Sequence, residues 1–260
     1  AGSAAAFSIG RPLIGPALGG WRPLFFASGT ASVVLVVLWA VLAWYVPAGR
    51  HDSSDTGFSI ASLSDDIRTV VTHRDIRLLI VLGTMYLFVL HGVQSWLVAI
   101  LEARGVAVEV AGSVTALLVV GQVIGVLAIP TIAERFGRTR ATVIGCGLLG
   151  ALGALGLLVT PSVVLLLAIP IIFVGLGVGG LSPLIRSIPV ELNDIGPALT
   201  GTAVGLVYAF GEIGGFLGPV LMGALRDTTG SFTAGIVLCA IAALIAAGAG
   251  VAMSDPDKSS

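Results

Sequence analysis

Apolar residues run along this chain in long blocks, without the period of a half-buried strand or of an amphipathic helix. Between Arg140 and Arg186 stand 45 residues without a charged side chain, interrupted only near Thr160-Pro161. Each crossing of a bilayer needs about 20 apolar residues, so a block of this length provides two. The pattern therefore predicts a polytopic membrane protein rather than a soluble core.

The same reading along the whole chain predicts eight membrane spans, all of them helices, and so an all-α fold. The spans cover residues 3–20, 24–46, 76–98, 110–132, 141–160, 162–184, 199–223 and 232–253. The one long connection, 47–75, is polar. Within it, Ser64-Asp65-Asp66 is typical of the capped start of a short helix.

Composition supports a lipid environment. The chain is 56% hydrophobic and 10% charged, with a mean hydropathy of +1.06, which leaves too little polar surface for a soluble protein of 260 residues. The lipid bilayer is therefore the first partner expected. A net charge of −1 gives no electrostatic reason to expect nucleic acid. Cys146 and Cys239 both lie in apolar spans, where we expect them to pack rather than to form a disulfide.

Basic residues are divided unequally between the two ends of the spans, and this predicts the orientation in the cell membrane, because basic loops are retained in the cytoplasm. One face holds Arg50, Arg68, Arg74, Arg77, Arg135, Arg138, Arg140, Arg186 and Lys258, and the other holds Arg22, Arg104 and Arg226. The loop 47–75 and the tail 254–260 are therefore expected in the cytoplasm. Arg11 falls inside the first span.

The chain also repeats itself. The sequence Gly-Pro-Ala-Leu-Gly-Gly at 15–20 returns as Gly-Pro-Val-Leu-Met-Gly at 218–223, after 203 residues. Two parallel halves joined by a long loop are a transporter arrangement. We therefore expect 1–46 to end one bundle, 47–75 to be the inter-bundle loop and 76–253 to form a six-helix second bundle. On this register about 130 residues, or four helices of the same protein, are expected upstream.

Two motifs resemble those of the major facilitator superfamily. Gly15-Pro16-x-x-Gly19-Gly20 before Trp21-Arg22 resembles its fifth-span motif, and Glu134-Arg135-x-Gly137-Arg138-x-Arg140 resembles the second copy of its cytoplasmic loop motif. Arg11 and Pro130 stand where that family has glycines. The segment 92–97, Gly-Val-Gln-Ser-Trp-Leu, with Ala111-Gly112, is similar to the cyanate and nitroimidazole-type permease branch. The resemblance implies spans five to twelve of a twelve-helix permease that works by alternating access.

The resemblance also implies residues that open and close the inner end of such a permease. The gating set is Glu134, Arg135, Gly137, Arg138 and Arg140, with hinges at Gly15, Pro16, Gly218 and Pro219. Physically, the loop carboxylate can face a helix N-terminus and the arginines can donate to carboxylates or lipid phosphates. The alternatives are that the arginines only follow the positive-inside bias and that the glycines only pack helices.

Polar groups inside apolar spans are the candidates for solute binding, because a buried charge persists only beside a partner or a wet cavity. They are Arg11, Tyr86, His91, Gln94, Trp96, Gln122, Tyr208 and Glu212, with Ser95 as a lesser member. His91 and Gln94 are the leading pair, since residues three apart share a helix face. A structural hydrogen bond is the alternative for His91. Glu212 is a candidate carrier of a coupling proton, and the alternative is a structural ion pair or hydrogen bond. Arg11 could neutralise an anionic solute, or it could tie the two halves together.

Three classes of function fit this pattern. The first is a secondary transporter for a small anionic or weakly acidic solute, with proton coupling. The second is a transporter-like receptor or complex subunit, and the third is an intramembrane hydrolase using Ser28 and His91. Two Gly-x-Gly-x-x-Gly matches, at 145–150 and 175–180, follow no strand, so we expect neither nucleotide binding nor any other cofactor.

Overall fold

The computed structural model describes residues 14, 17, 19–45, 60–192 and 195–254, and it divides at Leu63 into two units. In the first unit, α3 (Trp21–Tyr45) agrees with the predicted span 24–46. Its serine and threonine hydroxyls donate to backbone carbonyls of the same helix; Thr30, for example, donates to the carbonyl of Phe26 at 2.8 Å. The predicted span 3–20 lies almost wholly outside the described residues, so it stays a prediction.

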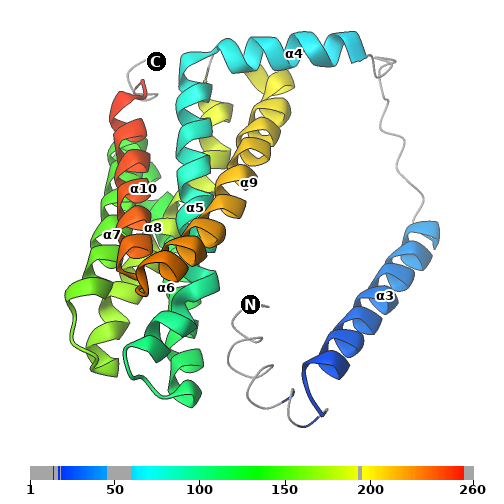
Figure 1. Ribbon diagram of the computed structural model, residues 1–260. Helices are drawn as coiled ribbons and strands as arrows, with labels where there is room; N and C mark the ends of the chain where they lie inside the picture. The colour runs from blue at the N-terminus through cyan, green and yellow to red at the C-terminus, as the bar shows by residue number, and fades with distance from the viewer. Residues whose placement is uncertain (1–13, 15–16, 18, 46–59, 193–194, 255–260) are drawn as a thin grey trace. The chain divides into compact units, whose positions relative to one another are not determined.

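The second unit, from Ser64 onward, is a bundle of six long helices entered through the short helix α4 (Figure 1). The helices are α4 (Ile60–Thr72), α5 (Arg74–Ala103), α6 (Val108–Phe136), α7 (Thr139–Val159), α8 (Val164–Glu191), α9 (Gly196–Thr229) and α10 (Thr233–Ala252). Helices α5, α6 and α9 contain their predicted spans and continue past them, because helical hydrogen bonding extends beyond the apolar run. Helices α7, α8 and α10 overlap theirs but miss one or two predicted end residues. With α3, seven described helices are long and apolar enough to cross a membrane.

One predicted boundary is wrong. Helix α4 begins at Ile60, so Ser64 lies inside it rather than at its start. Residues 60–63 contain no glycine or proline, and the helix therefore continues back through them to Ile60.

Close backbone contacts between helices hold the bundle together. Helix α9 packs most extensively on α5 and crosses it at an incline, while α8 packs on both α6 and α7 (Figure 1). A Cβ at Gly214 or Gly218 of α9 would overlap the carbonyl oxygen of Thr84 or Phe88 of α5. Small residues thus let the helices approach, as expected for packing without a hydrophobic driving force in lipid.

The two Gly-x-Gly-x-x-Gly segments, 145–150 of α7 and 175–180 of α8, also contact each other through glycines. A Cβ at Gly177 of α8 would overlap the carbonyl of Cys146 and would lie 2.7 Å from the Gly150 nitrogen of α7. In the structure these glycines serve helix contact. Both cysteines are buried and free, and the Cys239 sulfur lies 3.6 Å from that of Met222.

Glycines in the left-handed conformation end three of the helices. Gly105, Gly137 and Gly230, with φ of 84°, 54° and 70°, follow α5, α6 and α9, where a residue with a Cβ would be strained. We call the end at which α5 and α7 begin the basic end. There Arg74 donates to the carbonyl of Ala252 at 2.9 Å and Arg140 donates to that of Val251, which ties the end of α10 to α5 and α7.

Candidate functional site

A cluster of polar side chains lies where α5, α8 and α9 meet. The Tyr86 hydroxyl of α5 lies near Ser182 of α8, and it interacts electrostatically with Arg186 of α8 and with Tyr208 and Glu212 of α9. We call these five residues the polar cluster. Tyr86 is only 7% exposed, so its hydroxyl brings a polar group into an otherwise apolar interior.

Arg186 provides the positive charge of the polar cluster. Its guanidinium carbon lies 5.2 Å from the centroid of the Tyr208 ring, and Nη1 donates to the Ser182 hydroxyl at 3.1 Å. Among the described residues, no carboxylate forms an ion pair with it. A guanidinium has five N–H donors, so most of them remain for a ligand. The cluster therefore offers, beside two phenol groups, a cation that forms no direct ion pair with a described carboxylate, not even with Glu212 of the same cluster.

The two tyrosines of the polar cluster stand deep along their helices, whereas Arg186 and Glu212 are exposed. Tyr86 and Tyr208 each stand 12 residues from the basic end of their helices, which corresponds to a depth of about 18 Å. The Tyr208 hydroxyl is buried and has no hydrogen-bond partner within the described residues. An unpartnered hydroxyl at this depth is an unmet polar group, which a bound solute or water would satisfy.

His91 of α5 lies near Glu212, a member of the polar cluster, across the contact of α5 with α9. The point where a Cβ on Gly215 would stand lies 3.1 Å from His91 Nδ1 and 3.2 Å from Glu212 Oε2. The missing side chain of Gly215 thus makes room for both groups. The structure brings together two candidates that the sequence presents on separate helices.

The remaining polar candidates are placed differently. Gln94 is half-buried one turn beyond His91, whereas Ser95 is exposed. On α6, the Gln122 amide nitrogen is buried without a hydrogen-bond partner in the described part of the chain. The backbone of Gln122 packs against Gly175 and Gly179 of α8. Gln122 is therefore a second unmet polar group, on a different helix from the cluster.

Trp96 has a structural partner. Its indole N–H donates to the carbonyl of Pro219 at 2.9 Å, and its ring lies 5.6 Å from that of Phe232. The N–H of residue 223 would be the usual partner of the Pro219 carbonyl in a helix, so Trp96 adds a tie between α5 and α9 beside the predicted hinge. Gly218, next to it, makes the close approach to Phe88.

The predicted gating motif forms the turn between α6 and α7. Gly137 ends α6 in the left-handed conformation, and Arg138 immediately precedes α7. The side chains of Glu134, Arg135 and Arg138 are exposed and, within the described residues, have no hydrogen-bond or ion-pair partner. Arg140 is the member that is engaged, through Val251. Arg11, Gly15 and Pro16 lie outside the described residues.

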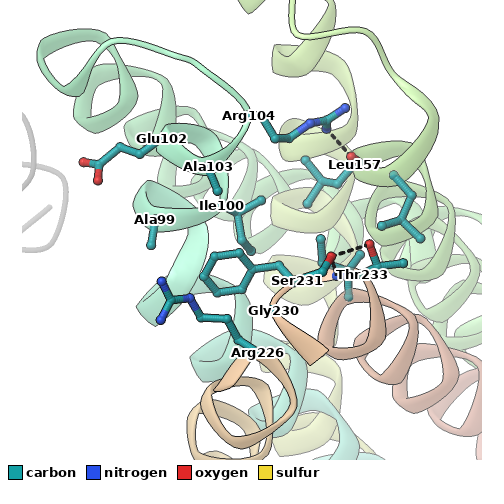
Figure 2. Close-up of a pocket in the computed structure, with 13 residues that line it drawn as sticks. Ala99, Ile100, Glu102, Ala103, Arg104, Leu157, Arg226, Gly230, Ser231 and Thr233 are labelled. Carbon is teal, nitrogen blue, oxygen red and sulfur yellow. Dashed lines mark hydrogen bonds between the residues drawn. The ribbon is translucent and has the colours of Figure 1, made fainter. Parts of the chain in front are cut away.

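A pocket of about 440 Å³ opens at the end of the bundle opposite the basic end (Figure 2). Its Arg104 donates to the carbonyls of Leu157 and Thr160 at the end of α7, and Arg226 stacks on Phe232 and pairs with Asp227. Figure 2 shows Glu102 directed away from Arg104. The cations of this pocket are already engaged, and the pocket lies at the ends of helices. Transporters bind solute near the bilayer midplane, so we prefer the polar cluster as the solute site.

Sequence reasoning missed Arg186 and Ser182 as site residues. Charge counting places Arg186 on the basic face, and in the structure it stands within α8, five residues before the helix ends at Glu191. Its position four residues after Ser182, on one helix face, was the available signal.

Long apolar helices, helix contacts built on glycine and a cation within a candidate membrane span define a polytopic transport-type bundle. The family model described as Major Facilitator Superfamily matches residues 1–219 and 93–259, and the chain belongs to that superfamily of membrane transporters. The predicted family and the all-α multi-pass fold are thus confirmed. A transporter family also decides against the intramembrane hydrolase.

Several curated proteins are similar to the chain. It is 27% identical over 248 residues to the uncharacterized transporter YycB of Bacillus subtilis, covering 95% of this chain and 58% of that protein. It is 30% identical to the gentisate transporter of Corynebacterium glutamicum (88% and 51% covered) and 27% identical to the cyanate transport protein CynX of Escherichia coli (74% and 48%). The chain spans about half the length of these relatives.

Proposed function

We propose that the protein is a secondary transporter that carries a small anionic solute across the cell membrane by alternating access. The observation that carries this proposal is Arg186, a cation about 8 Å from the end of its helix that has no described counter-ion. Arg186 stands within a candidate membrane span and is exposed on the bundle. A charge within a membrane span persists only beside a partner or a wet cavity, and an anionic solute would be such a partner.

The names of the relatives support the anionic class. Gentisate and cyanate are anions, and a putative tartrate transporter of Agrobacterium vitis is 29% identical over 152 residues, 58% of this chain. The common element among these solutes is the negative charge, since their sizes differ. A guanidinium with free donors and two phenol groups suits this chemistry, because it can bind a carboxylate through two parallel hydrogen bonds.

In this proposal Arg186, Tyr208 and Tyr86 bind the anion, and His91 with Gln94 lines its path. Glu212 beside His91 takes up and releases a coupling proton. Gln122 and Arg11 contribute further polar groups to the path, whereas Trp96 positions α9 through Pro219. Residues 76–253 act as one rigid bundle, which moves against the bundle that includes 1–46.

The experiment is solute counterflow in proteoliposomes that contain the protein as its native gene encodes it. Vesicles loaded with unlabelled gentisate, tartrate or cyanate should accumulate the labelled form of a solute that the protein carries. Accumulation of none of these anions, nor of other small carboxylates, would contradict an anion transporter. A transporter-like receptor would bind solute without counterflow.

We also propose that the basic end faces the cytoplasm, with the loop 47–75 and the tail 254–260. Native Cys146 and Cys239 are buried, so cysteines placed at exposed Arg138 and Arg226 should dominate labelling. In intact cells an impermeant maleimide should label R226C and spare R138C. Equal labelling of both would overturn the orientation.

A further inference from the structure

A groove lies between α6 and α7 at the basic end, and of the predicted gating set only Arg138 lines it. It encloses about 300 Å³ and is lined by Ile129, Ile132, Phe136, Arg138, Ala141, Thr142, Gly145, Cys146 and Leu149. Helices α6 and α7 pack mainly on α8, and α7 also on α10, so the two touch each other little. The groove is the space left between them.

The walls of the groove are apolar and the mouth is basic. Ile132 and Phe136 are exposed, as a surface that faces lipid would be. Arg138 is the only charged residue among those that line it, and it stands at the turn where α6 ends and α7 begins. Along α7 the groove runs from Ala141 to Leu149, a length of about 12 Å.

The charges at the mouth favour an anion. Arg135 and Arg138 are both exposed, Glu134 opposes them with one negative charge, and Arg140 is held by Val251. Arg138 precedes α7 without a side-chain hydrogen bond that caps the helix, so backbone N–H groups of its first turn add to the positive potential. Thr142 donates back to the Arg138 carbonyl at 3.0 Å and does not cap them.

Gly145 determines the depth of the groove. A Cβ at Gly145 would meet no atom within 4 Å, although neighbouring Gly147 is packed tightly against Ala247 of α10. Gly145 therefore leaves open space where Gly147 serves packing. The groove is thus apolar along its length and ends at Arg138, whose side chain has no partner among the described residues. This arrangement matches a phospholipid, with the acyl chain along the apolar part and the phosphate at the arginine.

We propose that this groove binds one phospholipid with a net negative headgroup, its phosphate at Arg138 and an acyl chain over Gly145. Basic pockets between helices at the basic membrane face recognise such lipids by charge. The acyl chain distinguishes this ligand from a free phosphate, which would use only the mouth. The proposal does not depend on which solute is carried.

Native mass spectrometry of the purified protein with added phosphatidylglycerol or phosphatidylcholine tests the site. We expect tighter binding of phosphatidylglycerol, weakened about fivefold in R138Q, since a basic residue near the surface contributes about that factor. Gly145→Leu, which fills the groove, should also weaken it. Gly248→Leu is the matched control, because Gly248 of α10 is likewise open and exposed but lies outside the groove.

Several outcomes would overturn the site. Equal binding of the two lipids would remove the charge recognition, and unchanged binding in R138Q would remove the headgroup site. An equal loss in Gly248→Leu would show a general effect of bulk on a lipid-facing helix. If glycerol phosphate displaced phosphatidylglycerol at an equal concentration, the mouth of the groove would be a site for a free phosphate rather than for a lipid headgroup. Because R138Q changes an exposed side chain, it keeps the test valid if Gly145→Leu fails to fold.

Discussion

The guanidinium of Arg186 lies over the ring of Tyr208, 5.2 Å from its centroid, and joins α8 to α9 on the exposed side of these helices. Tyr86 of α5 interacts with both residues, so three helices converge on one cation. A movement of α9 relative to α8 would change this contact. In the proposed function, such a movement would alter the binding of solute at the cluster.

Replacing Arg186 tests the binding of the anion. We expect R186Q to lower uptake kcat/KM by about 10- to 100-fold, mainly through KM, because a hydrogen bond to a charged group contributes about 1.5–3 kcal/mol. R186K should fall between, since it keeps the charge and loses the planar fork. R77Q removes an exposed arginine near the start of α5 and is the control. Equal losses of uptake in R186Q and R77Q would show that Arg186 contributes only through the overall charge of the protein.

The path along α5 can be tested by shortening its polar side chains. We expect His91→Ala or Gln94→Ala to reduce uptake several-fold, roughly the effect of one lost hydrogen bond, at normal membrane abundance. Ser95→Ala is the control, because Ser95 is exposed on the same helix. Unchanged uptake kinetics in both variants would remove these residues from the path.

Glu212 is expected to carry the coupling proton. Uptake by the native protein should rise as the external solution becomes more acidic, because protonation then precedes inward movement. Glu212→Gln should show a flat pH profile with retained solute exchange, since an amide cannot release a proton. The control is Glu109→Gln, an exposed carboxylate at the start of α6. A variant with the native pH profile would exclude this role.

Two glycines of α9 should respond oppositely to the same substitution. A Cβ at Gly214 would overlap the Thr84 carbonyl, whereas a Cβ at Gly205 would meet nothing within 4 Å. We expect Gly214→Ala to destabilise the protein by about 1–3 kcal/mol through overpacking. Gly205→Ala should be neutral or stabilising by up to about 1 kcal/mol, because alanine favours helix. Thermal unfolding in detergent measures both, and similar melting temperatures would contradict the α5–α9 contact.

Arg104 should matter for stability more than Arg226. Arg104 donates to two carbonyls that α7 leaves unpaired at its end, at Leu157 and Thr160, so R104Q should cost about 1.5 kcal/mol or more. Arg226 pairs with Asp227 at 3.4 Å, with the two side chains 50% and 74% exposed, so R226Q should cost less than about 1 kcal/mol. A reversed order in thermal unfolding would show that Arg104 does not hold α7.

The sequence alone determined the membrane environment, the approximate helix bounds, the turn at Gly137 and the family. These are local properties: about 20 apolar residues require a helix in lipid, and a glycine suits a left-handed turn wherever it stands. Even the helix start predicted at Ser64 differs by only a few residues from the observed start of α4 at Ile60.

Only the tertiary structure decided which polar groups meet. Charge counting placed Arg186 on a basic face, and nothing in its sequence neighbourhood indicated Tyr208. His91 and Glu212 lie 121 residues apart and meet only because Gly215 lets α5 and α9 approach. Apolar composition identifies a helix as buried in lipid or protein but does not specify its neighbour. The crossing of each pair follows instead from where small side chains allow two backbones to touch.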